Sequence, residues 1–306
     1  LFYLTIAHDF RSFGASEMLG AGGQKRVPER FLKDWMPPLP PLDTQRRIAA
    51  FLDEKTARID GLIAKKRELL ERLAEKRQAL ITQAVTKGLN PHASMKPSGI
   101  DWLGDIPAHW EVLPFKRLLL SSTYGVSATL QPAGEIAILR MGNLVAGKIS
   151  LEDLRFLNEV DDSLLLEEGD VVFNRTNSLD LVGKSAIFHN TGDIAVSFAS
   201  YLVRFRFNKR YTPQYANYLM GLNQLLELAR TLALRSIGQA NLNPNRYAQI
   251  EFPVPPTSEQ HEISAYIEQA SETSTQTSLE LLKSIELLTE YRSALITAAV
   301  TGQIEF

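Results

Sequence analysis

The chain has 306 residues, of which 44% are hydrophobic and none is cysteine, so it can bury more than one core while disulfides, thiolate metal sites and cysteine nucleophiles are excluded. Its formal net charge of −2 does not by itself indicate a nucleic-acid partner. Because there is no run of 18 apolar residues and no basic-then-apolar leader, we expect a cytoplasmic protein with no membrane partner.

The first predicted unit, residues 1–42, is interpreted through an internal duplication. Residues 38–45 align with 253–260 at an offset of 215, and at this offset eight of the ten residues of 77–86 recur in 292–301. So long a period describes a domain plus a connector, not a solenoid repeat. We therefore expect the chain to begin part-way through the first copy, with residues 1–42 as the C-terminal remnant of its domain.

Two long helices are predicted after the Pro-rich segments, at residues 43–90 and 257–306. From Ile48 to Ile81 apolar residues recur every three or four positions, which predicts a rod of roughly 65 Å. The second helix repeats the pattern, and the Ser- and Thr-rich stretch 271–278 is its weakest part.

Charge suggests how these two helices pair. Residues 44–88 contain 11 Lys and Arg against 6 Asp and Glu, whereas residues 258–306 contain 2 against 8. Helices of opposite sign, each with one apolar stripe, favour each other over self-pairing. We predict an intramolecular, antiparallel coiled coil. The alternative is two solvated helices, each lying on its own domain.

Residues 91–256 are predicted to form a complete domain of mixed α/β structure with mostly antiparallel strands, so the fold class of the chain is α+β. Strands are expected at residues 137–140, 170–173, 185–188 and 200–207. In the last of these, Arg204 and Arg206 alternate with Tyr201 and other apolar residues, which predicts a half-buried strand. Residues 213–230 are predicted to form a single helix.

Three polar clusters in this domain are candidates for DNA contact, because Arg, Lys, Asn and Gln on loops can bind base edges or phosphates. The candidate residues are Arg140, Asn143 and Lys148; Asn174, Arg175, Thr176, Asn177 and Lys184; and Arg235, Ser236, Gln239, Asn241 and Asn243. Each cluster has the alternative of being an ordinary solvated loop. Gly238 and Gln239 recur as Gly23 and Gln24, which favours a structural or phosphate-binding role for them. Arg204 and Arg206 are weaker candidates that equally fit surface ion pairs.

No catalytic chemistry is predicted. The stretch 243–247 lacks the second proline of an adenine methyltransferase loop, and no Gly-rich cofactor loop or Walker loop accompanies it. The five histidines lack metal-ligand spacing. We therefore expect no catalytic residue, no cofactor and no metal. Since residues 113–256 hold 14 basic and 13 acidic residues, any DNA affinity must come from a local basic face and should be salt-sensitive.

Four segments resemble the specificity subunits of Type I restriction-modification systems. They are PPLDTQRRIAAFLD at 40–53, the helix end at 79–88, GIDWLGDIP at 99–107 and the approach to the second helix at 238–256. Together with the duplication, the resemblance covers essentially the whole chain. The departure is that roughly the first 120 residues of the first recognition domain are absent, which puts reading of the first half-site in doubt.

The resemblance implies a non-catalytic subunit with target-recognition domains that each read one half of a split sequence in double-stranded DNA. It also implies that the helices form a spacer that docks methyltransferase (modification) subunits, and through them restriction subunits. A homodimer that restores two reading domains is left open. The rival interpretation is a coiled-coil scaffold that assembles protein partners without reading DNA sequence.

Overall fold

A computed structural model describes the chain except for residues 21–24, 191, 193, 237 and 306. It divides into two compact units, one of Leu1–Glu75 with Glu272–Phe306 (unit 1) and one of Lys76–Ser271 (unit 2). Each long helix contributes residues to both units. Within the described residues, no helix combines the length and apolar character that crossing a bilayer requires.

Unit 2 contains a central six-stranded sheet. Its strands lie in the order β4 (Leu119–Tyr124), β13 (Leu202–Phe207), β9 (Val171–Asn174), β11 (Ser185–Ile187), β7 (Gly147–Ile149) and β6 (Leu144–Val145). The neighbouring pairs are antiparallel except β11 with β7.

Smaller sheets complete the strands of unit 2. Two have three strands, in the orders β12 (Ala195–Phe198), β5 (Ile136–Leu139), β8 (Arg155–Leu157) and β10 (Thr176–Asn177), β15 (Gln239–Asn241), β14 (Leu234–Ser236). Two are pairs, β16 (Glu251–Val254) with β3 (Glu111–Pro114) and β1 (Met95–Pro97) with β2 (Asp105–Pro107). Of these pairings only β12 with β5 is parallel. The predicted α+β class with mostly antiparallel strands is confirmed.

The six-stranded sheet is covered on both faces, because successive residues of β9 enter different cores. Val171 and Phe173 join the buried cluster that includes helices α5 (Pro213–Met220) and α6 (Asn223–Leu232). Val172 joins the cluster formed with β5 and β12. A strand that is buried on both faces explains why 171–173 is a continuous apolar run and not an alternating one.

The helix predicted at 213–230 is in fact two helices, so that prediction is wrong. The first ends at Met220, and Leu222 has an extended backbone with φ −67° and ψ 137° before the second begins. Leu222 is fully buried. The break therefore lets Leu222 enter the core, a tertiary effect that helical periodicity does not reveal.

The domain core also takes in the end of helix α4 (Leu42–Lys87) and the start of helix α8 (Thr257–Val300). The hydroxyl of Tyr215 donates to the carbonyl of Val85 at 2.7 Å. The indole of Trp110, just before β3, donates to Glu259 Oε2 at 3.0 Å. Short helices η1 (Phe115–Arg117), η2 (Met141–Asn143), η3 (Asp162–Leu164) and α7 (Pro244–Tyr247) connect the remaining elements.

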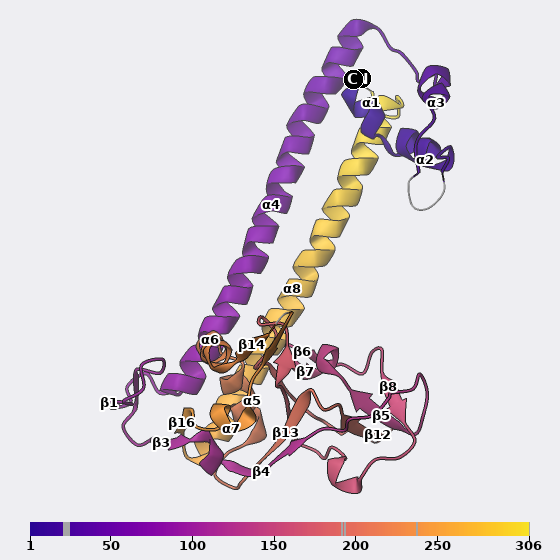
Figure 1. Cartoon of the computed structure of the whole chain (residues 1–306). Helices are drawn as coiled ribbons and strands as arrows, with labels where there is room; N and C mark the ends of the chain where they lie inside the picture. Colours follow the sequence, from indigo (N-terminus) through magenta and orange to yellow (C-terminus); the bar gives the residue numbers. More distant parts are fainter. Residues whose placement is uncertain (21–24, 191, 193, 237, 306) are drawn as a thin grey trace. The chain divides into compact units, whose positions relative to one another are not determined.

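In unit 1, α4 and α8 run side by side and antiparallel (Figure 1). Leu52 of α4 packs with Ile296 and Ala299 of α8, and further along α4 Asp60 contacts Arg292. In unit 2, Arg77 of α4 donates to Ser271 of α8 at 3.1 Å, so the direction is the same there. The predicted antiparallel pairing is confirmed, and the polar stretch 271–278 is helical.

The first three helices of unit 1 correspond, at the offset of 215, to three helices of unit 2. They are α1 (Phe2–Ile6), α2 (His8–Ser16) and α3 (Glu29–Asp34), which correspond to α5, α6 and α7. The bridge between Leu19 and Arg26 corresponds to the pairing of Leu234 with Asn241. The side chain of Gln45 donates to the carbonyl of Pro40 as its counterpart in α8 does to Pro255. The expected recurrence at Gly23 and Gln24 lies outside the described residues.

Candidate nucleic-acid interface

Three strand ends meet at one end of the six-stranded sheet. β13 begins beside the ends of both of its neighbours, since Val203 pairs with Tyr124 on β4 and Leu202 pairs with Asn174 on β9. Arg175 follows β9, and its backbone N–H donates to the carbonyl of Tyr201 at 3.1 Å. Side chains from three segments far apart in the sequence are therefore held together by the sheet.

The guanidinium of Arg175 is fixed by several contacts. It lies over the ring of Tyr124, 5.1 Å from the centroid. One terminal nitrogen donates to Asn241 Oδ1 at 3.0 Å, and the other lies 3.4 Å from the carbonyl of Ser200. The backbone carbonyl of Arg175 accepts from Leu242 at 2.7 Å, which ties β9 to the segment that carries Asn241. We call Tyr124, Arg175, Tyr201, Gln239 and Asn241 the Arg175 site.

These contacts bring two of the three predicted clusters into one place. Thr176 pairs with Asn241 and Asn177 with Ala240, so β10 joins the sheet of β15 and β14. Gln239 and Asn241 are exposed on either side of buried Ala240, and their side chains therefore leave the same face of β15. The clusters at 174–184 and 235–243 thus form a single surface.

Several candidate residues of this surface are either buried or engaged in local hydrogen bonds. Asn174 and Thr176 are only 2% and 4% exposed, and Asn174 Oδ1 and Thr176 Oγ1 have no hydrogen-bond partner among the described residues. Asn177 accepts from the backbone N–H of Ser178, and Asn243 caps α7 by accepting from Asn245. Arg235 is exposed, Lys184 is half-buried, and the side chain of Ser236 lies outside the described part.

The third predicted cluster organises its own loop. Arg140 donates to the carbonyl and to Oδ2 of Asp153 at 2.7 and 2.8 Å. Asn143 is 4% exposed, and its amide donates to the carbonyls of Ser150 and Glu152. Lys148 is exposed on β7. In the described part of the chain, no hydrogen bond joins this cluster to the Arg175 site.

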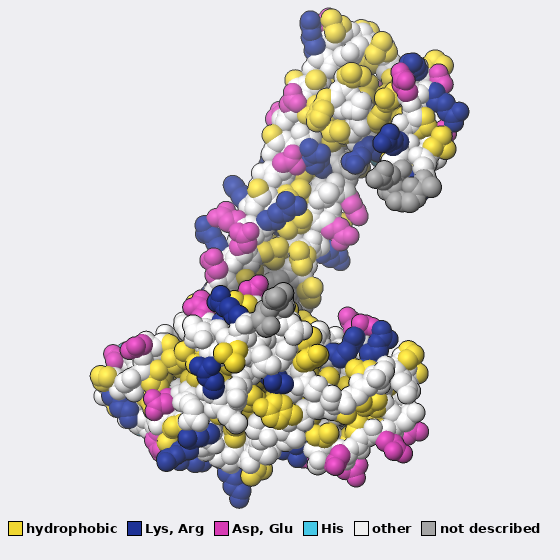
Figure 2. All heavy atoms as spheres, viewed as in Figure 1, with side chains coloured by type: hydrophobic (Ala, Val, Ile, Leu, Met, Phe, Trp, Pro, Cys, Tyr) yellow, Lys and Arg dark blue, Asp and Glu magenta, His cyan; other side chains and the backbone are white. Residues whose placement is uncertain are grey.

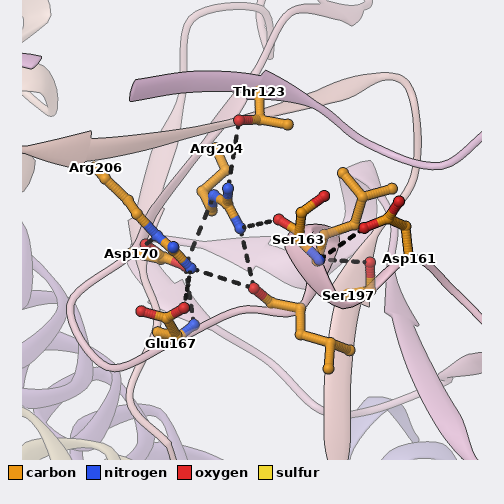
Figure 3. A network of polar contacts seen from close by, with 10 residues as sticks. Thr123, Asp161, Ser163, Glu167, Asp170, Ser197, Arg204 and Arg206 are labelled. Carbon is orange, nitrogen blue, oxygen red and sulfur yellow. Dashed lines mark hydrogen bonds and ion pairs between the residues drawn. The ribbon is translucent and has the colours of Figure 1, made fainter. Parts of the chain in front are cut away.

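Arg204 and Arg206 belong to a network that holds the loop 161–170 on β13 (Figure 3). Arg204 is 4% exposed and donates to the carbonyls of Ser163 and Leu165 at 2.9 and 3.0 Å. Arg206 Nε contacts Asp170 Oδ1 at 2.7 Å. Burial lowers the pKa of Arg204, whereas the hydrogen bond to Asp170 raises the pKa of Arg206.

The strand predicted at 200–207 is present as β13, but the expectation that it is half-buried is wrong. The face that carries the arginines is covered by the loop 161–170, and Tyr201, assigned from its alternation to the apolar face, is 46% exposed. Arg204 takes part in a buried ion network, whereas a surface ion pair was one interpretation of the sequence. Its guanidinium donates to two carbonyls of the loop and so ties the loop to β13.

Sequence reasoning missed the two tyrosines of the Arg175 site. Tyr124 is 48% exposed at the end of β4, where exposed and half-buried residues alternate. The signal available was an aromatic residue at an exposed position of a polar strand. Its relation to Arg175 depends on strand order, which the sequence does not give.

On the face seen in Figure 2, charged side chains are dispersed. In Figure 2 the Lys and Arg side chains over the sheet-bearing part lie singly or in small groups, separated by apolar and uncharged surface. Such a surface attracts an anionic partner only locally. A specific contact would therefore depend on the geometry of individual donors like those of the Arg175 site.

Comparisons with known proteins agree on one family. Residues 124–287 match the Type I restriction modification DNA specificity domain. The chain is 28% identical over 240 residues to the Type I restriction enzyme EcoKI specificity subunit of Escherichia coli strain K12, covering 76% of this chain and 50% of that one. It is 31% identical over 167 residues to the MjaVIII specificity subunit of Methanocaldococcus jannaschii, covering 53% and 37%. The chain thus spans about half the length of the curated relatives or less.

Among solved structures, the fold is similar to a chain from a study of complex assembly and conformational transition of the type I R-M system. The TM-score is 0.70 at 16% identity, covering 96% of this chain and 68% of that chain. At these identities the likeness concerns the fold.

Proposed function

The chain belongs to the Type I restriction modification DNA specificity family, and from this premise we propose that it is a non-catalytic subunit that reads one half of a bipartite DNA target. The observation that carries the proposal is the Arg175 site, which gathers a cation and two exposed amides within the matched residues 124–287. Arg, Asn and Gln are among the side chains that read base edges in the major groove.

We propose a division of labour along the chain. Residues 91–256 are the recognition domain, and residues 1–42 are the end of another such domain, because their helices repeat those of the complete one. Residues 43–90 and 257–306 form the spacer on which methyltransferase subunits dock, and through them restriction subunits. With DNA as its proposed target, this assembly is proposed to act in the cytoplasm.

Within the recognition domain, the proposed DNA-contacting residues are those that are exposed or half-buried around the Arg175 site. They are Arg175, Asn177, Lys184, Arg235, Gln239 and Asn241. Lys148 is a further candidate for phosphate contact, since it is exposed and forms no ion pair in the described part of the chain. Arg140 and Asn143 are assigned to shaping their own loop by the bonds that they make there.

The test uses the chain co-expressed with its methyltransferase subunits. Arg175→Ala should weaken discrimination at one position of the half-site by roughly 1–3 kcal/mol, measured by methylome sequencing and by DNA affinity in defined salt. Arg117→Ala is the matched control, since it removes an exposed guanidinium at the opposite end of β4. An unchanged target sequence for both variants would contradict the assignment of Arg175.

A coiled-coil scaffold remains the second candidate. It is favoured by large apolar side chains exposed on α8 in unit 1, where Leu282, Leu287 and Tyr291 are 52–57% exposed. Capture of methyltransferase subunits without sequence-dependent DNA retention would support it. The molecular mass of the purified chain in solution tests the further expectation of a homodimer.

A further inference from the structure

The contact between Arg175 and Asn241 fixes which way the amide points. The guanidinium carries only donors, so the contact is attractive only when the amide oxygen faces it, as it does at 3.0 Å. The amide NH2 group of Asn241 is therefore turned to the other side. Among the described residues that NH2 group has no acceptor, and Asn241 is exposed.

The guanidinium of Arg175 is held in place while some of its N–H groups remain without an acceptor in the described part of the chain. Its Nε is buried, one terminal nitrogen is bonded to Asn241, and the other makes only the long contact to the carbonyl of Ser200. The ring of Tyr124 supports the guanidinium, 5.1 Å from the ring centroid to its central carbon. Such a contact fixes the plane in which the remaining N–H groups lie.

The pair consequently presents N–H donors and little acceptor capacity. In the major groove, guanine offers two acceptors, N7 and O6, whereas adenine offers one acceptor and one donor. Reading adenine with an Asn side chain requires both its oxygen and its nitrogen, and the oxygen of Asn241 is already engaged. Cytosine offers a donor, and thymine a single acceptor beside a methyl group.

We propose that Arg175 and Asn241 read a guanine in the major groove, with Tyr124 as the residue that positions the guanidinium. The inference rests on the proposed function, because it names the base that the Arg175 site recognises. Gln239, on the same face of β15 as Asn241, lies next to this pair and contacts the neighbouring position of the DNA.

The test compares DNA duplexes that differ by one atom of one base. With the target of the co-expressed complex known, each guanine of the half-site is replaced in turn by 7-deazaguanine, which lacks the N7 acceptor. For the wild-type complex, one replacement should weaken binding about fivefold or more. For Arg175→Ala the same replacement should have a much smaller effect, since the guanidinium donors are gone and only the amide of Asn241 remains.

Substitutions at three further positions separate the reading of the base from folding. Asn241→Asp keeps an acceptor for Arg175 but removes the outward donors of the amide, so it should weaken the guanine preference. Asn245→Asp changes an exposed Asn on α7 and should leave that preference unchanged. Tyr124→Phe should retain the target and Tyr124→Leu should relax it. Thermal unfolding of each variant shows whether the fold survives.

The outcomes distinguish the two proposals. If the wild-type complex shows no sequence-dependent binding, the proposed function itself fails. If it binds specifically but no guanine replacement is coupled to Arg175, or if Arg175→Ala relaxes an A·T position, guanine reading is overturned while DNA recognition stands. If Tyr124→Leu behaves as wild type, the positioning role of Tyr124 is overturned.

Discussion

Arg292 on α8 grips Asp60 on α4 with two hydrogen bonds, from Nε to Oδ1 at 2.8 Å and from the terminal nitrogen to Oδ2 at 3.1 Å. Its duplicated counterpart Arg77 reaches across from α4 in the opposite sense and donates to Ser271. The same arginine of the repeat therefore links the helices in both directions. Asp60 lies on α4, the helix that is basic on average, and Arg292 lies on α8, the helix that is acidic on average. The pairing expected from the net charges of the two helices therefore does not explain this contact.

The contact between Arg292 and Asp60 should contribute little to stability. The two side chains are 30% and 52% exposed, and solvent screens such pairs. Asp60→Asn and Arg292→Ala should each lower the free energy of unfolding by about 0.5–1 kcal/mol, with a coupling of similar size in a double-mutant cycle. Urea unfolding measures it. Arg72→Ala, which breaks an exposed pair within α4, is the control with a smaller expected change.

The network around Asp170 should be much more sensitive. The Asp170 carboxylate is 3% exposed and faces both Arg204 and Arg206, so Asp170→Ala leaves a buried guanidinium without its counter-charge. We expect a loss of about 3 kcal/mol in the free energy of unfolding. Glu167→Ala removes a carboxylate that is 70% exposed and should change stability by less than about 0.5 kcal/mol. Equal effects of the two substitutions in urea unfolding would contradict this account.

The sequence predicts the parts of the fold that depend on local periodicity and on the duplication. The two long helices, their antiparallel pairing and the strands at 137–140, 170–173 and 185–188 are of this kind. It does not predict the break at Leu222 or the burial of Arg204, because each depends on which distant segment covers that residue.

The sequence predicts the candidate site only as separate polar loops. Arg175 and Asn241 are 66 residues apart and meet only because β10 pairs with β15. Residue type alone marks each as able to contact DNA, but it gives neither the partner nor the orientation of the amide. Asn143 is also of a type that can contact DNA, but its amide NH2 group donates to carbonyls of its own loop.

Acid should weaken the contact that Glu168 makes with the segment after β11. The backbone N–H of Asn190 and the side chain of His189 lower the pKa of Glu168 from its ordinary value of 4.5. A carboxylate with a lowered pKa in the folded state stabilises that state at pH above 4.5, and this contribution disappears as the pH falls through the lowered value.

The stability difference between wild type and Glu168→Gln should therefore be constant near neutral pH and shrink below pH 4.5. It should be small, because the Glu168 side chain is 60% exposed. Thermal unfolding between neutral pH and pH 3 measures it. A difference that grows on acidification would show that Glu168 does not make this contact in solution.

Gly125 directly follows Tyr124 at the end of β4, and its backbone N–H donates to the carbonyl of Leu202 at the start of β13. We expect this position to tolerate no side chain. A Cβ there would collide with the backbone carbonyls of Phe198 and Ala199, which accept hydrogen bonds from the backbone of Val126 and Leu202 and cannot retreat as a flexible side chain would. Gly125→Ala should therefore destabilise the domain by about 1–3 kcal/mol and displace Tyr124 from Arg175.

The matched control is Gly142→Ala, where a Cβ would meet no atom within 4 Å and the backbone is not left-handed. It should leave both stability and target sequence unchanged. Gly125→Ala should also relax the recognition sequence below its unfolding temperature, because the guanidinium of Arg175 loses the ring that supports it. Unfolding in urea and methylation patterns of the co-expressed complex report the two effects separately. If stability falls while the target stays the same, the backbone collision is real and the support of Arg175 by Tyr124 is dispensable for recognition.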